Sequence, residues 1–183
     1  MNSATRTYLE NIHSEDHALQ NKAFEALLKA TDKRVDWTYE AWDRLVADLR
    51  HKDNHVRAIA AQVLCNLAKS DPKNRMRKDF PALLAVTKDE RFVTARHCLQ
   101  ALWKVGAAGK AQQKMYMQGL EKRFKECIRE RNCTLLRYDI NVSMRNLYDR
   151  VHDETIKAKA LELNESERDL KYRKKYAGAW RGT

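Results

Sequence analysis

The fold is decided by one stretch, residues 37–69, which reads WTYEAWDRLVADLRHKDNHVRAIAAQVLCNLAK. Its first half, residues 39–50, has an apolar stripe at helical spacing that consists of Trp42, Leu45, Val46 and Leu49. A polar turn follows at residues 51–55. The second half has another apolar stripe, made of Val56, Ala60, Val63, Leu64 and Leu67. We therefore predict two amphipathic helices joined by a polar turn, with the small Ala60 allowing the helices to approach closely.

The same helix–turn–helix unit recurs along the chain with a period of about 35–37 residues. An upstream copy repeats four of its positions 37 residues earlier, as Asp16, Leu19, Ala23 and Leu27. Downstream, Asp89 follows Asp53 by 36 residues. Ala95 follows Ala60 by 35 residues, so these two turns differ in length by one residue. A recurring unit of this length is typical of helical-repeat proteins, in which stacked helix pairs share a core.

The composition favours an all-α chain. Hydrophobic residues make up 43% of the 183 residues, whereas 5 Gly and 2 Pro are too few to form the turns of a β-sandwich or barrel. We predict a single domain over residues 1–183. It contains four helix pairs and a charged C-terminal cap, at residues 5–31, 37–70, 72–106, 111–151 and 154–177. In the third pair we expect Asp71 to cap a helix that begins at Pro72, and a second helix that ends at Gly106.

The repeated unit resembles a HEAT repeat. The resemblance is carried by Pro81 and Leu84 in a first helix, by Asp53 or Asp89 in the turn, and in a second helix by Val56, Arg57, Ala60, Leu64 and Leu67. It covers about residues 5–151, although the 37–70 repeat lacks the first-helix proline and Val93-Thr94 stands where Val-Arg is usual. The chain is also similar to short bacterial HEAT-repeat proteins, a group that supplies a fold but no reaction. The resemblance implies a right-handed α-solenoid of about four HEAT-like helix pairs with a C-terminal capping helix.

Charge is distributed unevenly along the chain. Residues 1–71 carry 10 basic and 11 acidic side chains, whereas residues 72–183 carry 26 basic and 14 acidic ones. Such an asymmetry favours an anionic partner for the second part of the chain, although Lys and Arg that merely solvate helix surfaces would give the same count.

In a solenoid of helix pairs the second helices line the concave surface, where partners usually bind. Eight residues are expected on or beside that surface in the last two repeats: Arg96, His97, Gln100, Trp103, Lys104, Tyr138, Asn141 and Arg145. Arg and Lys pair with carboxylates or phosphates, and Trp or Tyr stack on exposed bases. We therefore predict a non-enzymatic binding or scaffold module whose basic concave face engages an acidic protein segment or nucleic acid.

Some of these residues have a second interpretation. Trp103 also fits a packing role between repeats. Arg57 and Arg96 also fit a ladder of ion pairs with acids in the turns, such as Asp53 and Asp89.

An enzymatic alternative comes from a resemblance to alkylpurine DNA glycosylases built from HEAT-like pairs. That resemblance implies an aromatic residue, a carboxylate and basic residues gathered on the concave face. The available set is Trp103, Arg96, Arg145, Tyr138 and either Asp139 or Asp149. No contiguous motif supports the match.

Other chemistries find little support. His13 with His17 and His51 with His55 have a spacing used by metal ligands, but no third ligand accompanies them, so we interpret them as exposed turn histidines. Cys127 and Cys133 have no evident thiol partner and are interpreted as ordinary cysteines. There is no glycine-rich phosphate loop, and we expect no cofactor, no metal ion and no small-molecule substrate.

The compartment is predicted from cysteines and hydropathy. The four cysteines are scattered in a way that fits reduced thiols better than a disulfide framework. The longest uncharged stretch, residues 58–68, has 11 residues, which is too short to span a membrane. We therefore expect a cytoplasmic protein without a membrane partner.

Overall fold

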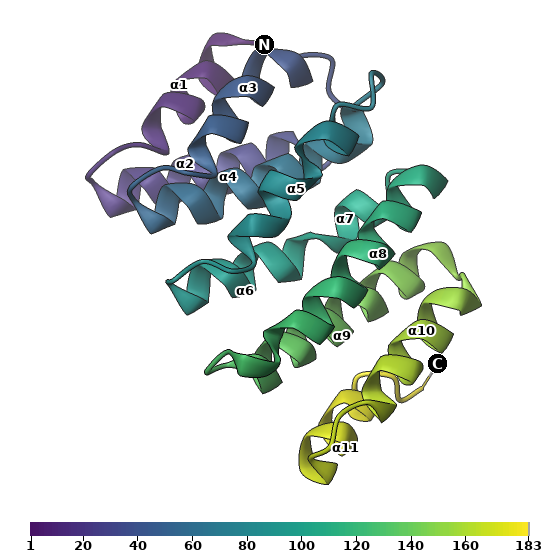
Figure 1. Ribbon diagram of the computed structural model, residues 1–183. Coiled ribbons are helices and arrows are strands. Elements are labelled where there is room, and N and C mark those ends of the chain that lie inside the picture. Colours follow the sequence, from purple (N-terminus) through teal and green to yellow (C-terminus); the bar gives the residue numbers. More distant parts are fainter. Residues whose placement is uncertain (183) are drawn as a thin grey trace. The chain divides into compact units, whose positions relative to one another are not determined.

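The computed structural model describes residues 1–182, and within them it contains helices and no strand (Figure 1). The helices are, in chain order, α1 (Ser3–Asn11), α2 (His17–Ala30), α3 (Thr38–Asp48), α4 (Asn54–Leu67), α5 (Met76–Val86), α6 (Phe92–Ala101), α7 (Trp103–Gly106), α8 (Lys110–Glu126), α9 (Cys133–Val151), α10 (Glu154–Glu165) and α11 (Leu170–Gly178). Two 3₁₀ turns, η1 (Ala68–Ser70) and η2 (Cys127–Arg129), follow α4 and α8. The predicted all-α fold class is confirmed. None of the described helices combines the length and the apolarity needed to cross a bilayer.

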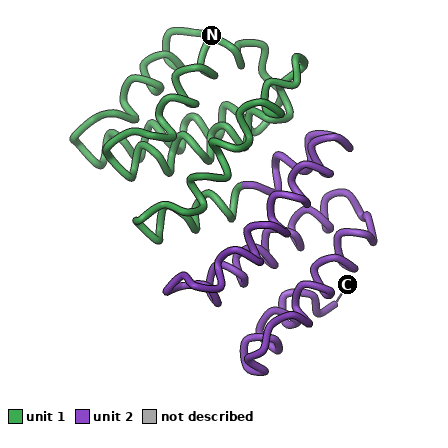
Figure 2. The backbone as a smooth tube through the Cα atoms, in the orientation of Figure 1, with its two compact units in different colours: residues 1–101 green, residues 102–183 purple. Residues whose placement is uncertain are grey.

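The chain divides into two compact units, residues 1–101 and the residues from Leu102 onward (Figure 2). The division falls between α6 and α7, where Leu102 interrupts the helix. The prediction of one helix ending at Gly106 is therefore wrong, because its last turn forms the separate α7, which packs on α8 and α9. Gly106 permits that packing: a Cβ atom there would lie 2.7 Å from Leu147 Cδ2 and 3.1 Å from Tyr116 Cδ1.

In residues 1–101 the helices form three consecutive pairs, α1 with α2, α3 with α4, and α5 with α6. The second helices lie side by side, with α4 in contact with both α2 and α6 (Figure 1). Their apolar stripes form the core, where buried residues include Ala23, Leu27, Val56, Ala60, Val63, Leu64, Leu67, Ala95, Cys98 and Leu99.

Aspartates determine where several of these helices begin. Asp16 accepts two backbone N–H groups of α2 at 2.8 and 3.3 Å, and Asp53 accepts one of α4 at 2.8 Å. Asp71 accepts the N–H groups of Arg75 and Met76, so α5 begins at Met76. The prediction that this helix begins at residue 72 is wrong, because the turn extends until the Asp71 carboxylate reaches the first N–H groups of α5.

Neighbouring helix pairs are joined by side-chain hydrogen bonds that span one repeat. Trp42 Nε1 donates to Asp79 Oδ2 at 2.8 Å, across 37 residues. Asn66 Nδ2 donates to Thr31 Oγ1 at 3.1 Å, across 35 residues, and this bond is buried. The period of the sequence thus appears in the structure as bonds between successive repeats.

In the residues after Ala101, α8 packs with α9, and α10 and α11 both pack on α9. The C-terminal cap is thus two helices rather than one, and it supplies part of the core. Tyr176 Oη donates to the carbonyl of Thr134 at 2.9 Å, and Trp180 Nε1 donates to Asn141 Oδ1 at 3.0 Å.

Two buried arginines are paired with glutamates in this second unit. Arg123, which is 2% exposed, donates to both carboxylate oxygens of Glu130 at 2.6 and 2.7 Å. Arg137 donates to Glu167 Oε2 at 2.9 Å. Burial alone would raise the pKa of Glu167, but hydrogen bonds from the Asp169 backbone and from Arg137 hold it below its ordinary value. The Glu167 carboxylate is therefore charged inside the protein.

Candidate functional site

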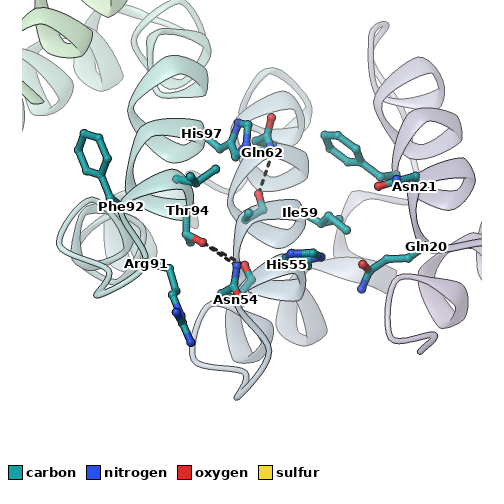
Figure 3. A pocket seen from close by; sticks show the side chains of 13 residues that line it. Gln20, Asn21, Asn54, His55, Ile59, Gln62, Arg91, Phe92, Thr94 and His97 are labelled. Carbon is teal, nitrogen blue, oxygen red and sulfur yellow. Dashed lines mark hydrogen bonds between the residues drawn. The ribbon is translucent and has the colours of Figure 1, made fainter. Parts of the chain in front are cut away.

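A groove with a volume of about 520 Å³ runs over α2, α4 and α6 in residues 1–101 (Figure 3). We refer to it as the α4 groove. It is lined by Gln20, Asn21, Phe24, Asn54, His55, Ala58, Ile59, Gln62, Arg91, Phe92, Val93, Thr94 and His97. Its volume lies within the range of roughly 300–1,000 Å³ that is usual for ligand sites.

The groove opens where α6 departs from the repeat pattern. Ala60 and Ala95 are corresponding buried positions, but six residues of α4 precede Ala60 whereas three residues of α6 precede Ala95. The first turn of α6 therefore leaves apolar side chains outside the core, and Val93 is 62% exposed. This is the position where Val-Thr replaces the Val-Arg of the HEAT pattern.

Apolar side chains form much of the groove surface. Ala58 and Ile59 of α4 are buried and lie beneath it, while Phe24 and Phe92 are half-buried. A partner that covers Phe24, Phe92 and Val93 would remove apolar surface from water, at a gain of about 25 cal/mol per Å².

Amide side chains supply polar contacts. Gln20 and Gln62 donate their Nε2 hydrogens to backbone carbonyls at 2.8 and 3.1 Å. Asn54 donates to Thr94 Oγ1 at 3.4 Å, a bond drawn in Figure 3. Asn54 and Gln62 are half-buried, so their amide oxygens can accept N–H groups of a partner, whereas Gln20 is buried. Asn21 is exposed and adds a fourth amide.

The ionisable side chains of the groove are basic. Among the residues that the structure describes, the lining includes Arg91, His55 and His97 but no aspartate or glutamate. All three of these side chains are exposed. The groove therefore suits a partner that carries carboxylates or other anionic groups.

A half-buried ion pair holds the basic end of the groove. Arg57 donates through Nε and Nη2 to the two oxygens of Asp89 at 2.5 and 2.8 Å, and Asp89 Oδ1 also accepts the backbone N–H of Arg91 at 2.8 Å. Arg57 Nη1 further donates to the carbonyls of His51 and Lys52 in the turn before α4. One guanidinium thus joins the two turns from which α4 and α6 start.

For Arg57 the structure bears out the second interpretation, in which this residue pairs with a turn acid. The hydrogen bonds that Arg57 donates to Asp89 raise the pKa of Arg57. Burial would raise the pKa of Asp89, but hydrogen bonds from Arg57 and the Arg91 backbone hold it below its ordinary value. For Arg96 the structure shows a different contact: its guanidinium lies 5.7 Å from the centroid of the Phe92 ring.

The histidines form pairs between repeats. The rings of His17 and His55 lie 5.1 Å apart, and those of His13 and His51 lie 5.4 Å apart. His13 is half-buried rather than exposed, and its Nε2 bonds Asp48 at 2.9 Å. Within residues 1–182, no group of three or more His, Cys, Asp or Glu side chains is arranged to hold a metal ion.

The sequence-predicted binding residues are dispersed. His97 lines the α4 groove, and Gln100 is exposed on the same helix. Trp103 and Lys104 begin α7, where Lys104 Nζ lies 5.9 Å from a Trp103 ring centroid.

In α9 the predicted binding residues make contacts within the protein. Asn141 is 1% exposed because its side chain bonds the Arg137 carbonyl and Trp180, so it is a core residue and not a surface one. Arg145 donates to Asp149 and also to the carbonyls of Ala179 and Arg181, which fixes the end of the chain after α11. Lys175 Nζ lies 4.6 Å from the Tyr138 ring centroid.

Of the two carboxylates considered for a glycosylase-like reaction, one is buried and the other is paired with an arginine. Asp139 is 1% exposed within α9. Asp149 is exposed and pairs with Arg145. No observation therefore favours the enzymatic alternative.

Sequence patterns did not identify Phe24, Arg91 or Phe92 as groove residues. A usable signal was present in α6, because Phe92 and Val93 are large apolar residues that precede the core stripe formed by Ala95, Cys98 and Leu99. Arg91 had no such signal, since its position depends on the bond to Asp89.

The fold has counterparts among solved structures. Two engineered proteins solved by the Northeast Structural Genomics Consortium match 98% of this chain, with TM-scores of 0.53 and 0.50 at 18% and 16% identity, and the matches cover 80% and 95% of those chains. A designed armadillo repeat protein, in complex with the peptide (KR)4, matches 97% of this chain and 98% of its own at a TM-score of 0.48 and 12% identity. No protein-family model matches the sequence, and no curated protein matches it. At these identities the likeness concerns the helical fold alone.

Proposed function

We propose that the chain is a HEAT-type binding module whose α4 groove receives an acidic segment of a partner protein, without a chemical step. The observation that carries this proposal is the composition of the groove: exposed Val93 and half-buried aromatic rings lie beside Arg91 and two histidines, without an acidic side chain in the described lining. Exposed apolar surface next to basic groups suits a ligand that presents both apolar and carboxylate side chains.

An extended peptide is the ligand class that uses all three kinds of group. Its backbone N–H groups would donate to amide oxygens such as those of Asn54 and Gln62, and its carboxylates would pair with Arg91. Its apolar side chains would cover the exposed rings and Val93. Peptides that wrap helical-repeat surfaces in this way need no cavity that closes around them.

The proposed surface includes part of the region predicted from the sequence. His97 lies in the groove, and Gln100 is three residues further along α6, so it lies on the same face. Arg96 adds a cation beside Phe92. Trp103, Lys104, Tyr138 and Arg145 lie outside the groove lining and are not part of the peptide proposal, and Arg145 is engaged by Asp149 and by the carbonyls of Ala179 and Arg181.

Fluorescence anisotropy with labelled peptides tests the proposal. The first peptide alternates Glu with Leu and Phe, and the second has Lys in place of Glu. We expect the acidic peptide to bind and the basic one not to bind. Arg91→Glu should weaken binding by about tenfold or more, because it replaces a pairing cation with a repelling carboxylate.

The matched control is Arg77→Glu, which makes the same change in net charge at an exposed position of α5 outside the groove. This variant should bind like the parent at near-physiological salt, where distant charges are screened. Equal weakening by Arg77→Glu and Arg91→Glu would show that net charge, and not the groove, attracts the peptide.

Nucleic-acid binding is the second candidate, and the charge of residues 102–183 favours it, since they carry 19 basic and 11 acidic side chains. The same assay with duplex DNA, single-stranded DNA and structured RNA tests this candidate. Binding that persists at near-physiological salt, with a linear log–log salt slope, would indicate several phosphate contacts. Lys104→Glu should reduce that slope if this residue contacts a phosphate, whereas binding lost at modest salt would leave the peptide proposal alone.

A further inference from the structure

Two buried thiols face one another in the second unit. Cys127 is the first residue of η2 and Cys133 the first residue of α9, and their Sγ atoms are 2.8 Å apart. Our sequence-based interpretation of these cysteines as thiols without a partner is wrong, because the turn η2 and the loop after it fold the chain back so that the sulfurs meet. Neither residue takes part in the groove or in the proposed function.

The segment between the two cysteines lies at the surface. Ile128 is 65% exposed, and residues 129–131 are exposed as well. Cys127 is fully buried, whereas Cys133 keeps 9% of its surface exposed. Cys133 is therefore the more accessible of the two cysteines.

We propose that Cys127 and Cys133 form a redox modification site, which a low-molecular-weight organic disulfide such as oxidised glutathione converts to an intramolecular disulfide. The Cys133 thiolate attacks one sulfur of the reagent, which forms a mixed disulfide and releases one equivalent of thiol. The Cys127 thiolate then attacks the Cys133 sulfur of that mixed disulfide and releases the second equivalent. Two electrons pass from the cysteine pair to the reagent, and the two cysteine protons end on the released thiols.

The surroundings make this exchange slow at neutral pH. Burial raises the pKa of the Cys127 thiol to about 12, and the neighbouring Cys133 adds to this effect, while Arg137 and Arg123 oppose it. Because the thiolate is the attacking species, the rate of disulfide closure should rise about tenfold per pH unit below that pKa.

The other two cysteines provide an internal comparison. Cys65 and Cys98 are both fully buried in the core of residues 1–101, and Cys98 Sγ donates to the Leu83 carbonyl at 3.4 Å. Neither lies beside an exposed loop of the kind that follows Cys127. They should remain thiols under conditions that oxidise the pair.

The test is incubation of the native full-length chain with oxidised glutathione, followed by acid quench, alkylation and peptide mass spectrometry. We expect one internal disulfide that joins Cys127 to Cys133, formed faster at about pH 8 than at about pH 7. Cys127→Ser should instead accumulate a glutathione adduct at Cys133, since the second attack is lost. Cys133→Ser should form little adduct, because the accessible sulfur is absent.

Two results would overturn the proposal. In the first, both cysteines stay alkylatable in the folded chain and oxidise only in denaturant together with Cys65 and Cys98. In the second, Cys127→Ser yields no adduct although circular dichroism shows native helix content. The double variant Cys65→Ala with Cys98→Ala serves as a control and should still form the disulfide, provided that it retains native helix content.

Discussion

Residues 1–101 and the residues from Leu102 onward are both built of packed helices, but they are held together by different kinds of contact. In the first unit, bonds such as Trp42 to Asp79 join equivalent places in successive repeats. In the second unit, the key bonds are particular to one place, such as Arg137 to Glu167. Periodic bonds follow from a repeated sequence, whereas single buried ion pairs do not.

This difference explains where the groove is found. A regular stack of second helices gives a smooth surface, and the α4 groove appears where α6 starts late within that stack. The proposed binding surface thus lies where one helix departs from the repeat pattern, within a unit that otherwise follows that pattern.

The strongest way to break the periodic unit is Trp42→Ala. Trp42 is fully buried, and its loss leaves a large cavity and removes the donor to Asp79. We expect a loss of about 5 kcal/mol in the free energy of unfolding, at the upper end for aromatic truncations. Urea unfolding followed by circular dichroism measures the loss.

Trp42→Phe separates the two contributions to that loss. It removes the Nε1 hydrogen bond but leaves a smaller cavity than alanine does, so it should cost less than Trp42→Ala, about 2 kcal/mol. A loss as large as that of Trp42→Ala would show that the bond to Asp79, and not packing, dominates this position.

In the second unit the corresponding test is Glu167→Gln. It leaves the buried guanidinium of Arg137 without a charged partner, which should cost about 3 kcal/mol. The double variant Arg137→Met with Glu167→Leu removes both charges and should recover much of that loss. If the double variant is less stable than Glu167→Gln, the pair stabilises the fold beyond avoiding an unpaired charge.

The contrast between the units also shows how far the sequence alone could lead. Apolar spacing predicted the helix pairs because they recur with the repeat. The Arg57–Asp89 bond was one of the interpretations that the sequence left open for Arg57. It did not predict the break at Leu102, which depends on how α7 packs on helices distant in the sequence.

The binding residues were harder to predict for a physical reason. A side chain such as Asn141 lies on the expected face by helical spacing, yet it is buried because Trp180, from beyond α11, covers it. Arg91 enters the groove through a bond made by the preceding turn. Helical periodicity carries no information on either contact.

The ion pair that joins the turns of the first unit gives a pH-dependent prediction. Because the pKa of Asp89 is lowered in the folded state, its stabilising contribution is present above the ordinary aspartate pKa near 4 and is lost as pH falls through the lowered value. A double-mutant cycle with Arg57→Ala and Asp89→Asn should give a coupling energy of about 1–2 kcal/mol at neutral pH. The coupling should shrink on acidification, and a coupling that is constant with pH would contradict the assignment.

The smallest expected effect tests whether N-terminal helix caps contribute equally to stability in the two units. Asp16 caps α2 in the first unit, and Asp169 caps α11 in the second by accepting the backbone N–H of Lys171 at 2.8 Å. Each aspartate changed to alanine should cost about 1 kcal/mol, and each changed to asparagine should cost much less, because asparagine also accepts the bond. Peptide-resolved hydrogen exchange of the full chain shows whether protection is lost in α2 or in α11.

If the two alanine variants lose the same stability, the helix ends of the two units behave alike. The units would then differ only in the contacts between their helices. A much larger cost at Asp169 would point to its neighbour Glu167, which accepts the Asp169 backbone N–H at 3.1 Å and also holds Arg137. In that case the cap of α11 and the buried ion pair stabilise the second unit together. The helix caps of the first unit would then act independently of its other contacts, whereas those of the second unit would not.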